Sequence, residues 1–244
     1  MTRVDAIERA ATTAWPAQET ASMGEWVLSA GGGFSRRRNS SVPIGPYLSD
    51  AEHQVERVAA WYRERGVVPR FRITPECAPE TDELLMQLGY IREAPTIVLA
   101  RSLDASVIPD GIVESPVATD AWITAELDAL GIDRSLVGPW VETINAVPSP
   151  RVFAMAINEG AAIGAGFGVV VDGLLASFEV AVAEAHRRQG HARRLMAALH
   201  AFGAREGAGE AFLQVEEANA PAIALYESLG YRLAYPYWYR LLDA

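Results

Sequence analysis

The sequence predicts an α/β protein in which a mixed, twisted sheet is flanked by helices and the chain forms two similar halves. Strand-length apolar runs alternate with segments of helical periodicity, an order typical of this class. One strand, turn and helix pattern occurs twice, at an offset of 141 residues. With 244 residues, of which 50% are hydrophobic and 21% charged, the chain has a globular composition and is long enough to bury a large core.

The first half, predicted as a domain of residues 1–105, begins with an amphipathic helix. Its expected elements are a helix at 3–14, strands at 26–30 and 40–44, a helix at 50–65, a strand at 69–74, a helix at 79–88 and a strand at 94–100. The turn between the first two strands is rich in glycine and arginine, and its run Arg36 to Arg38 either binds an anionic ligand or is solvated. Residues 102–111 have the composition of a linker.

The second half is predicted as a domain of residues 106–244. Its expected elements are a strand at 112–115, helices at 119–130 and 137–145, strands at 151–158, 162–171 and 174–182, a helix at 190–206, a strand at 210–216, a helix at 220–229 and a strand at 232–242. The most apolar stretch, 160–183, is interrupted by Asp172-Gly173, a hairpin signal, so it is interpreted as two strands and not as a membrane span. Alternation along the last strand places Tyr235, Tyr237 and Tyr239 on one face and Trp238 on the other. These side chains either line a pocket or pack the sheet.

The internal repeat aligns Gly66–Tyr90 with Gly207–Tyr231, and both segments end in Leu-Gly-Tyr. It indicates a duplication. The two copies differ at several positions: Asn219 aligns with Ala78, Tyr226 with Leu85, and Arg187–Ala192 with Pro46–Ala51, which has no glycine turn. We therefore expect the second half to carry the functional site and the first half to support it and to close one side of a substrate cleft.

Charge and residue usage exclude several function classes. The formal net charge of −10 disfavours binding to nucleic acid or to an anionic membrane, and slightly favours a cationic substrate. All 21 basic residues are arginine, so no lysine nucleophile or Walker lysine is available. Cys77 is the single cysteine and the four histidines lack metal-site spacing, so we expect no disulfide and no metal. The polar N-terminal segment has no signal-peptide core, which predicts a cytoplasmic protein.

The sharpest motif follows an apolar strand and opens a helix. It consists of Arg187, Arg188, Gln189, Gly190, His191, Ala192 and Arg193. Free backbone N–H groups and the positive end of the helix dipole meet at such a position and suit a pyrophosphate. Gly190 allows a ligand to approach the backbone closely, and Arg188 and Arg193 add charge at the rim. The pattern by itself also fits an ordinary helix start that contains a glycine.

A second motif in register with the first makes the interpretation more specific. Residues 180–199, VAVAEAHRRQGHARRLMAAL, and 213–231, LQVEEANAPAIALYESLGY, resemble the GNAT superfamily of acyl-CoA-dependent N-acyltransferases. Their order and separation agree with the pyrophosphate motif of that family and with its later Asn and Tyr motif. The chain also resembles tandem GNAT proteins with a degenerate N-terminal half.

The resemblance implies roles for individual residues. Backbone groups of Val180 and Val182 would pair with the pantetheine amides, and Asn219 would hydrogen-bond the pantetheine arm. Tyr226 would protonate the leaving thiolate as a general acid. The implied acetyl-CoA site comprises Val180, Val182, Arg187, Arg188, Gln189, Gly190, His191, Ala192, Arg193, Asn219 and Tyr226.

At the position of the general base the sequence departs from several family members. Positions where these members place a carboxylate or histidine are Ala176 and Phe178 here, and a further family position is Gln214, which cannot act as a base. The nearest carboxylates, Glu179 and Glu216, are the candidates, with water as a third. Strand alternation directs Glu179 away from the site unless a bulge turns it.

Three hypotheses about function follow. The favoured one is transfer of an acetyl group from acetyl-CoA to a primary amine of a small molecule, peptide or protein by direct attack. The second is a non-catalytic regulatory protein that binds acyl-CoA, and the third is a structural or interaction protein. The amine acceptor is not identified, and the chain is expected to be a monomer or a homodimer.

Overall fold

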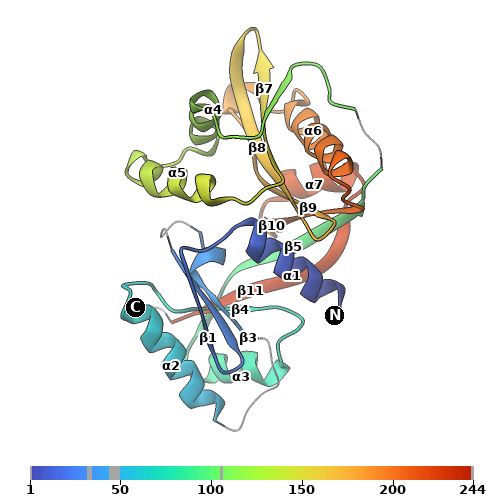
Figure 1. The fold of residues 1–244 in the computed structure, drawn as a ribbon. Coiled ribbons are helices and arrows are strands. Elements are labelled where there is room, and N and C mark those ends of the chain that lie inside the picture. Colours follow the sequence, from blue (N-terminus) through green and yellow to red (C-terminus); the bar gives the residue numbers. More distant parts are fainter. Residues whose placement is uncertain (1, 32–34, 44–49, 105–106, 243–244) are drawn as a thin grey trace.

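The computed structural model describes residues 2–31, 35–43, 50–104 and 107–242. Within these residues eleven strands form one sheet in the order β1-β2-β3-β4-β11-β5-β10-β9-β8-β7-β6, with helices on its faces (Figure 1). The predicted mixed sheet flanked by helices is confirmed. No helix in the described ranges is both long and apolar enough to cross a membrane.

The first half contains every element that the sequence predicts, with ends shifted by three residues at most. The elements are α1 (Arg3–Ala14), β1 (Glu19–Met23), β2 (Trp26–Ala30), β3 (Ser41–Pro43), α2 (Ala51–Arg63), β4 (Arg70–Ile73), α3 (Pro79–Gln87) and β5 (Ile91–Ser102). Strand β1 was not expected. It is a largely exposed edge strand of sequence ETASM, and it lacks the apolar alternation on which strand prediction depends.

The second half also follows the prediction. Its elements are β6 (Ile112–Ser115), α4 (Asp120–Leu130), α5 (Val137–Ala146), β7 (Arg151–Asn158), β8 (Ala161–Val171), β9 (Leu174–Val182), α6 (His191–Arg205), β10 (Glu210–Glu216), α7 (Ala220–Ser228) and β11 (Arg232–Leu241). The Thr119 hydroxyl caps α4 by accepting from the Trp122 N–H, and Gly131 in the left-handed conformation ends the helix. The hairpin at Asp172-Gly173 joins β8 to β9 as predicted.

The internal repeat is visible in the structure. At the offset of 141 residues, α3 coincides with α7, and β4 and β5 coincide with β10 and β11. Gly89 and Gly230, which end the two helices, have φ values of +87° and +88°. The two halves therefore share a strand, helix and strand unit at this offset. The counterpart of the Arg187–Ala192 motif in the first half, residues 46–51, lies mostly outside the described residues.

The two halves exchange their last strands. Strand β5 lies between β11 and β10, and β11 lies between β5 and β4, all antiparallel. Helix α1 packs on β8 and β9 of the other half (Figure 1). The division at residues 105 and 106 stays a prediction, because these elements cross it in space.

The core consists of three clusters. One lies between the sheet and helices α1, α4 and α5, and there Trp15 stacks on Phe167 and Phe178 with ring centroids 5.2 and 5.3 Å apart. The second lies under α6 and α7 on the opposite face, and the third lies under α2 and α3. Trp15 therefore joins the N-terminal segment to the aromatic core of the second half.

The arginine run is neither a solvated turn nor a free anion site along its whole length. Arg38 is 2% exposed; its Nε donates to the Pro16 carbonyl at 2.7 Å, and its guanidinium also donates to the hydroxyl of Thr143 on α5. Arg36 pairs with the carboxylates of Glu93 and Glu216. These two arginines connect the halves, which corrects the solvated-turn interpretation.

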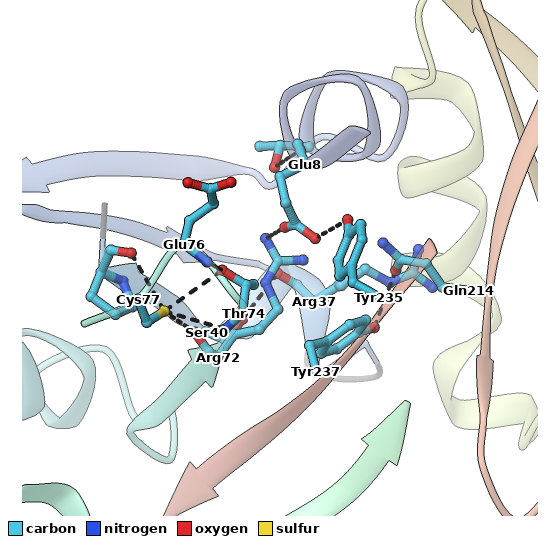
Figure 2. Close-up of polar contacts among 12 residues, drawn as sticks. Glu8, Arg37, Ser40, Arg72, Thr74, Glu76, Cys77, Gln214, Tyr235 and Tyr237 are labelled. Atoms are coloured by element: carbon cyan, nitrogen blue, oxygen red, sulfur yellow. Dashed lines mark hydrogen bonds and ion pairs between the residues drawn. The ribbon is translucent and has the colours of Figure 1, made fainter. Parts of the chain in front are cut away.

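A buried ion pair joins α1, β4 and β11 (Figure 2). Arg72 Nη2 lies 2.7 Å from Glu8 Oε2, and the Tyr235 hydroxyl donates to Glu8 Oε1 at 2.6 Å. Both charged side chains are largely buried, 5% and 12% exposed. Each charge therefore depends on the other for compensation.

We expect Arg72→Met to destabilise the protein by roughly 3–5 kcal/mol, because it leaves the Glu8 carboxylate buried without its cation. Urea unfolding followed by tryptophan fluorescence measures the change. The matched control is Arg63→Met, which removes an arginine whose ion pair with Glu56 is exposed, and it should leave the urea midpoint nearly unchanged. Equal midpoints for Arg72→Met and wild type would show that the ion pair does not stabilise the fold.

Candidate active site

A slot opens where β9 and β10 diverge. The two strands pair in parallel only from Glu210 and Leu174 to Phe212 and Ala176. Beyond that point β9 continues to Val182 and β10 to Glu216 without pairing to each other. The β9 edge that faces the slot thus leaves peptide groups for a ligand, which fits the predicted pairing of Val180 with a pantetheine arm. The carbonyl of Val182 already accepts from Arg187 Nε at 3.0 Å.

A β-bulge turns Glu179 into the site. The register of β8 and β9 shifts between Ala165 and Phe167, and Glu179 has a φ of +52°. Opposite the bulge, a Cβ added at Gly166 would lie 2.9 Å from the Val180 side chain, so the close approach requires glycine there. Glu179 consequently lines two cavities, one inside the slot and one beyond it.

The predicted pyrophosphate loop has the backbone that an anion site needs. Arg188 and Gly190 have φ values of +60° and +86°, and α6 begins at His191 without a side-chain cap. The first N–H groups of α6 therefore have no intrahelical acceptor. A Cβ added at Gly190 would meet no atom within 4 Å, so the space above the loop is open.

Most side chains of the loop contact other parts of the protein. Gln189 donates to the Ala185 carbonyl at 3.3 Å, and Arg193 donates to the Ser228 hydroxyl at 2.6 Å. His191 is buried, and burial lowers the pKa of its imidazole, with the charge of Arg194 adding to the effect. Ala192 packs against the core under α6. An anion would bind here through backbone N–H groups and exposed arginine, which fits the donor site.

The inner part of the slot is a cavity of about 260 Å³ that Asn219 and Tyr226 line. Asn219 is the N-cap of α7, and its Oδ1 accepts from the Ala222 N–H at 3.3 Å. Burial raises the pKa of Tyr226 to about 12, and the charge of Glu179 adds to the rise. A phenol with this pKa keeps its proton at neutral pH and remains available as a donor.

A larger cavity, of about 510 Å³, lies on the other side of Glu179 between the two halves. The N-terminal half contributes Trp15, Ser35, Arg36, Arg37 and Thr96 to its walls. Tyr237 and Tyr239 line it as well, while Trp238 donates to Asp82 at 3.0 Å on the other face of β11. On this strand Tyr237 and Tyr239 therefore line a pocket, whereas Trp238 packs on the opposite face of the sheet.

Five residues line both cavities and form the passage between them, which we call the throat. They are Arg37, Leu130, Glu179, Gln214 and Glu216. Burial raises the pKa of Glu179, and the nearby charge of Arg37 partly offsets this rise. Glu216 is more exposed, and its carboxylate is 2.8 Å from Arg36 Nη1. Of the two predicted bases, Glu179 is the one turned into the passage without an ion partner within 4 Å in the described residues.

Behind Glu179 lies a second carboxyl group, Glu126 on α4. It is fully buried, and neither carboxyl oxygen has a hydrogen-bond partner in the described residues. Burial raises the pKa of Glu126 well above its usual range, and the charge of Glu179 adds to this. Burial therefore favours the neutral, protonated form of Glu126.

Comparison with known proteins identifies the family. Residues 2–240 match the family described as "Probable histone acetyltransferase Rv0428c C-terminal". The chain belongs to this family. It is an acyl-CoA-dependent N-acetyltransferase of the GNAT superfamily.

Two relatives match this acetyltransferase over most of its length. The uncharacterized N-acetyltransferase YobR of Bacillus subtilis is 24% identical over 96% of this chain and 97% of its own length. The probable histone acetyltransferase Rv0428c of Mycobacterium tuberculosis is 28% identical over 94% of this chain and 71% of its own length.

Solved structures show the same fold. A GCN5-related N-acetyltransferase from Kribbella flavida has a TM-score of 0.77 at 17% identity, covering 100% of this chain and 97% of that one. A tandem GNAT protein from the clavulanic acid biosynthesis pathway has a TM-score of 0.64 at 12% identity, covering 100% and 89%.

Sequence reasoning did not place three groups at the acetyltransferase site. The run Arg36 to Arg38 was considered as an anion site, but the position of Arg37 in the throat depends on contacts between the halves. Gln214 was considered only as a base, whereas its amide is a donor in the throat. Glu126 did carry a signal, because it lies four residues after Trp122 on the buried face of α4. In the described residues, no group of three or more metal-ligating side chains is gathered for a metal ion.

We expect Glu126→Gln to change the pH dependence of stability. The raised pKa means that the folded state holds a proton that the unfolded state releases, so wild-type stability falls as the pH rises above the ordinary glutamate pKa. The free energy of unfolding of Glu126→Gln minus that of wild type should therefore grow with pH, by at most about 1.4 kcal/mol per pH unit. Urea unfolding between pH 5 and 8 measures it, and a constant difference would mean that Glu126 is ionised in the fold.

Proposed function

We propose that this acetyltransferase transfers the acetyl group of acetyl-CoA to a primary amine of a small molecule, peptide or protein by direct attack. The observation that carries the proposal is the position of Glu179 in the throat. It lies between a slot that contains a protonated Tyr226 and a separate cavity open to an acceptor. A base on the acceptor side and an acid on the donor side are the two groups that this reaction uses.

The donor would lie along the slot. Backbone N–H groups from Arg187 to Ala192 bind the pyrophosphate, with Arg188 and Arg193 at the rim, and Gln189, Gly190 and His191 form the turn. Val180 and Val182 offer peptide groups to the pantetheine, and Asn219 offers the amide nitrogen that its cap does not use. Acetyl-CoA supplies the thioester, whose carbonyl carbon forms the new C–N bond as its C–S bond breaks.

Side chains of this protein accept and donate the protons that the reaction transfers. Glu179 accepts the proton that the attacking amine releases, and its pKa, raised by burial, makes it a stronger base than an exposed glutamate. Tyr226 donates its phenolic proton to the departing sulfur. Glu216 is the second candidate for amine binding, although its ion pair with Arg36 reduces its basicity. We further propose that residues 106–244 form the catalytic domain and residues 1–105 a degenerate, supporting domain.

The alternative is a non-catalytic regulatory protein that binds acyl-CoA. The absence of a carboxylate at Phe178 and Ala176, which are both buried, favours it. Turnover of acetyl-CoA in the presence of amines separates the two hypotheses.

We expect Gly190→Glu to abolish acetyl-CoA binding, because it places a negative charge in the pyrophosphate loop and forces a side chain into a backbone with a φ of +86°. The matched control is Gly207→Glu, at the end of α6, where φ is +81° and the added Cβ also meets no atom within 4 Å. Calorimetric titration of both variants and wild type measures the effect. Binding retained by Gly190→Glu, or lost equally by both variants, contradicts the proposed donor site.

We expect Tyr226→Phe to lower kcat by roughly 100-fold or more while KM for acetyl-CoA changes little, because a general acid acts on the leaving group in the transition state. The defect should shrink when the donor is an acetyl thioester of an acidic aromatic thiol, which leaves without protonation. An undiminished defect with that donor would assign Tyr226 a packing role.

A further inference from the structure

The throat contains the cationic side chain of Arg37, which forms no ion pair with the throat carboxylates Glu179 and Glu216. The guanidinium of Arg37 is partly buried and lies 5.5 Å from the Phe178 ring centroid. In the described residues no acidic side chain lies within 4 Å of its nitrogens, whereas the neighbouring Arg36 pairs with Glu216 at 2.8 Å and Glu93 at 3.3 Å. Arg37 is thus the throat residue whose charge is left for a ligand.

A second donor in the throat is also unused. The Oε1 atom of Gln214 accepts from the Tyr237 hydroxyl at 3.1 Å (Figure 2). Its Nε2 atom is buried and has no hydrogen-bond partner in the described residues. A buried donor without an acceptor is costly, so such a group points to a ligand atom that accepts from it.

The position of these donors restricts what they bind. In the proposed reaction the acetyl carbon enters the throat from the slot and the amine enters it from the larger cavity, which places the reacting nitrogen at the throat. Arg37 and Gln214 line both cavities at this passage. An anionic group that meets them must therefore be attached close to the reacting nitrogen.

We infer that the acceptor is an amino acid with a free carboxylate on the carbon that bears the amine, and that Arg37 and Gln214 bind this carboxylate while Glu179 faces the amine. The inference rests on the proposed function. A simple alkylammonium would bring a second cation beside Arg37, whereas a zwitterion complements both Arg37 and Glu179. The aromatic walls, with Trp140, Tyr237 and Tyr239, suit an apolar or aromatic side chain.

The test uses matched pairs of acceptors that differ only in the carboxylate: phenylalanine and 2-phenylethylamine, tryptophan and tryptamine, leucine and isoamylamine. We expect wild type to acetylate at least one amino acid with a kcat/KM at least tenfold above that of its decarboxylated partner. In Arg37→Met the ratio of these two kcat/KM values should fall roughly 10- to 100-fold, because only the carboxylate loses a charged hydrogen bond, whereas a changed basicity of Glu179 affects both acceptors alike. Arg63→Met, in the exposed ion pair on α2, is the control for removing an arginine.

A second variant keeps the inference testable if Arg37→Met folds poorly. Gln214→Glu preserves the acceptor of the Tyr237 hydroxyl and replaces the unpartnered donor by a negative charge, so it should lower kcat/KM for the amino acid more than for its decarboxylated partner. Equal loss for both members of a pair in these variants would mean that the residues act on the thioester oxygen, and the inference would be wrong. It would also be wrong if wild type acetylated only the amines, a lysine side chain in a peptide, or no amino acid of the panel. Failure of the proposed function itself is distinguishable, because then acetyl-CoA is not bound in calorimetry and no amine releases CoA.

Discussion

The antiparallel pairing of β5 with β11 and β10 at the centre of the sheet is the constraint on which the rest of the structure depends. Each of the strands β5 and β11 belongs by sequence to one half and pairs with a strand of the other. The hydrogen-bonded ladder is therefore continuous across the boundary between the halves. Backbone hydrogen bonds therefore join the two halves in addition to the covalent connection between them.

The site depends on this connection, because residues of both halves form it. Glu179, Gln214 and Tyr226 come from the second half, while Arg37 and Trp15 come from the first. The electrostatics depend on the same arrangement, since Arg37 partly offsets the desolvation of a carboxylate that the bulge exposes to the throat. A half that has no pyrophosphate motif of its own in the sequence thus still determines the charge around the reacting groups.

Local patterns predicted most of the fold, and they are also the source of the proposal for the donor side of the site. The hairpin at Asp172-Gly173 and the glycine turn at Gly190 are encoded within a few residues, so the local sequence is enough to predict them. The acceptor side depends on contacts between distant segments. The contacts of Arg38 with Pro16 and Thr143, and the surroundings of the unpartnered Gln214 Nε2, join segments far apart in sequence, which no periodicity encodes. The sequence analysis named a bulge at Glu179 only as the condition under which this side chain would face the site. The close packing of Gly166 against Val180, which accompanies the bulge, joins two neighbouring strands and is not visible in the local sequence.

The place of β11 also has a consequence for how the chain acquires its structure. During synthesis β4 and β5 emerge early, but the strand that lies between them, Arg232–Leu241, is nearly the last segment to be made. The edges of β4 and β5 that pair with β11 in the final fold therefore stay unpaired while more than a hundred further residues are synthesised. Closure of the sheet is a late event between segments far apart in sequence, which makes folding slow compared with a chain of local contacts. Until the final strand is released, the edges of β4 and β5 are the surfaces on which a nascent chain would aggregate or require a chaperone.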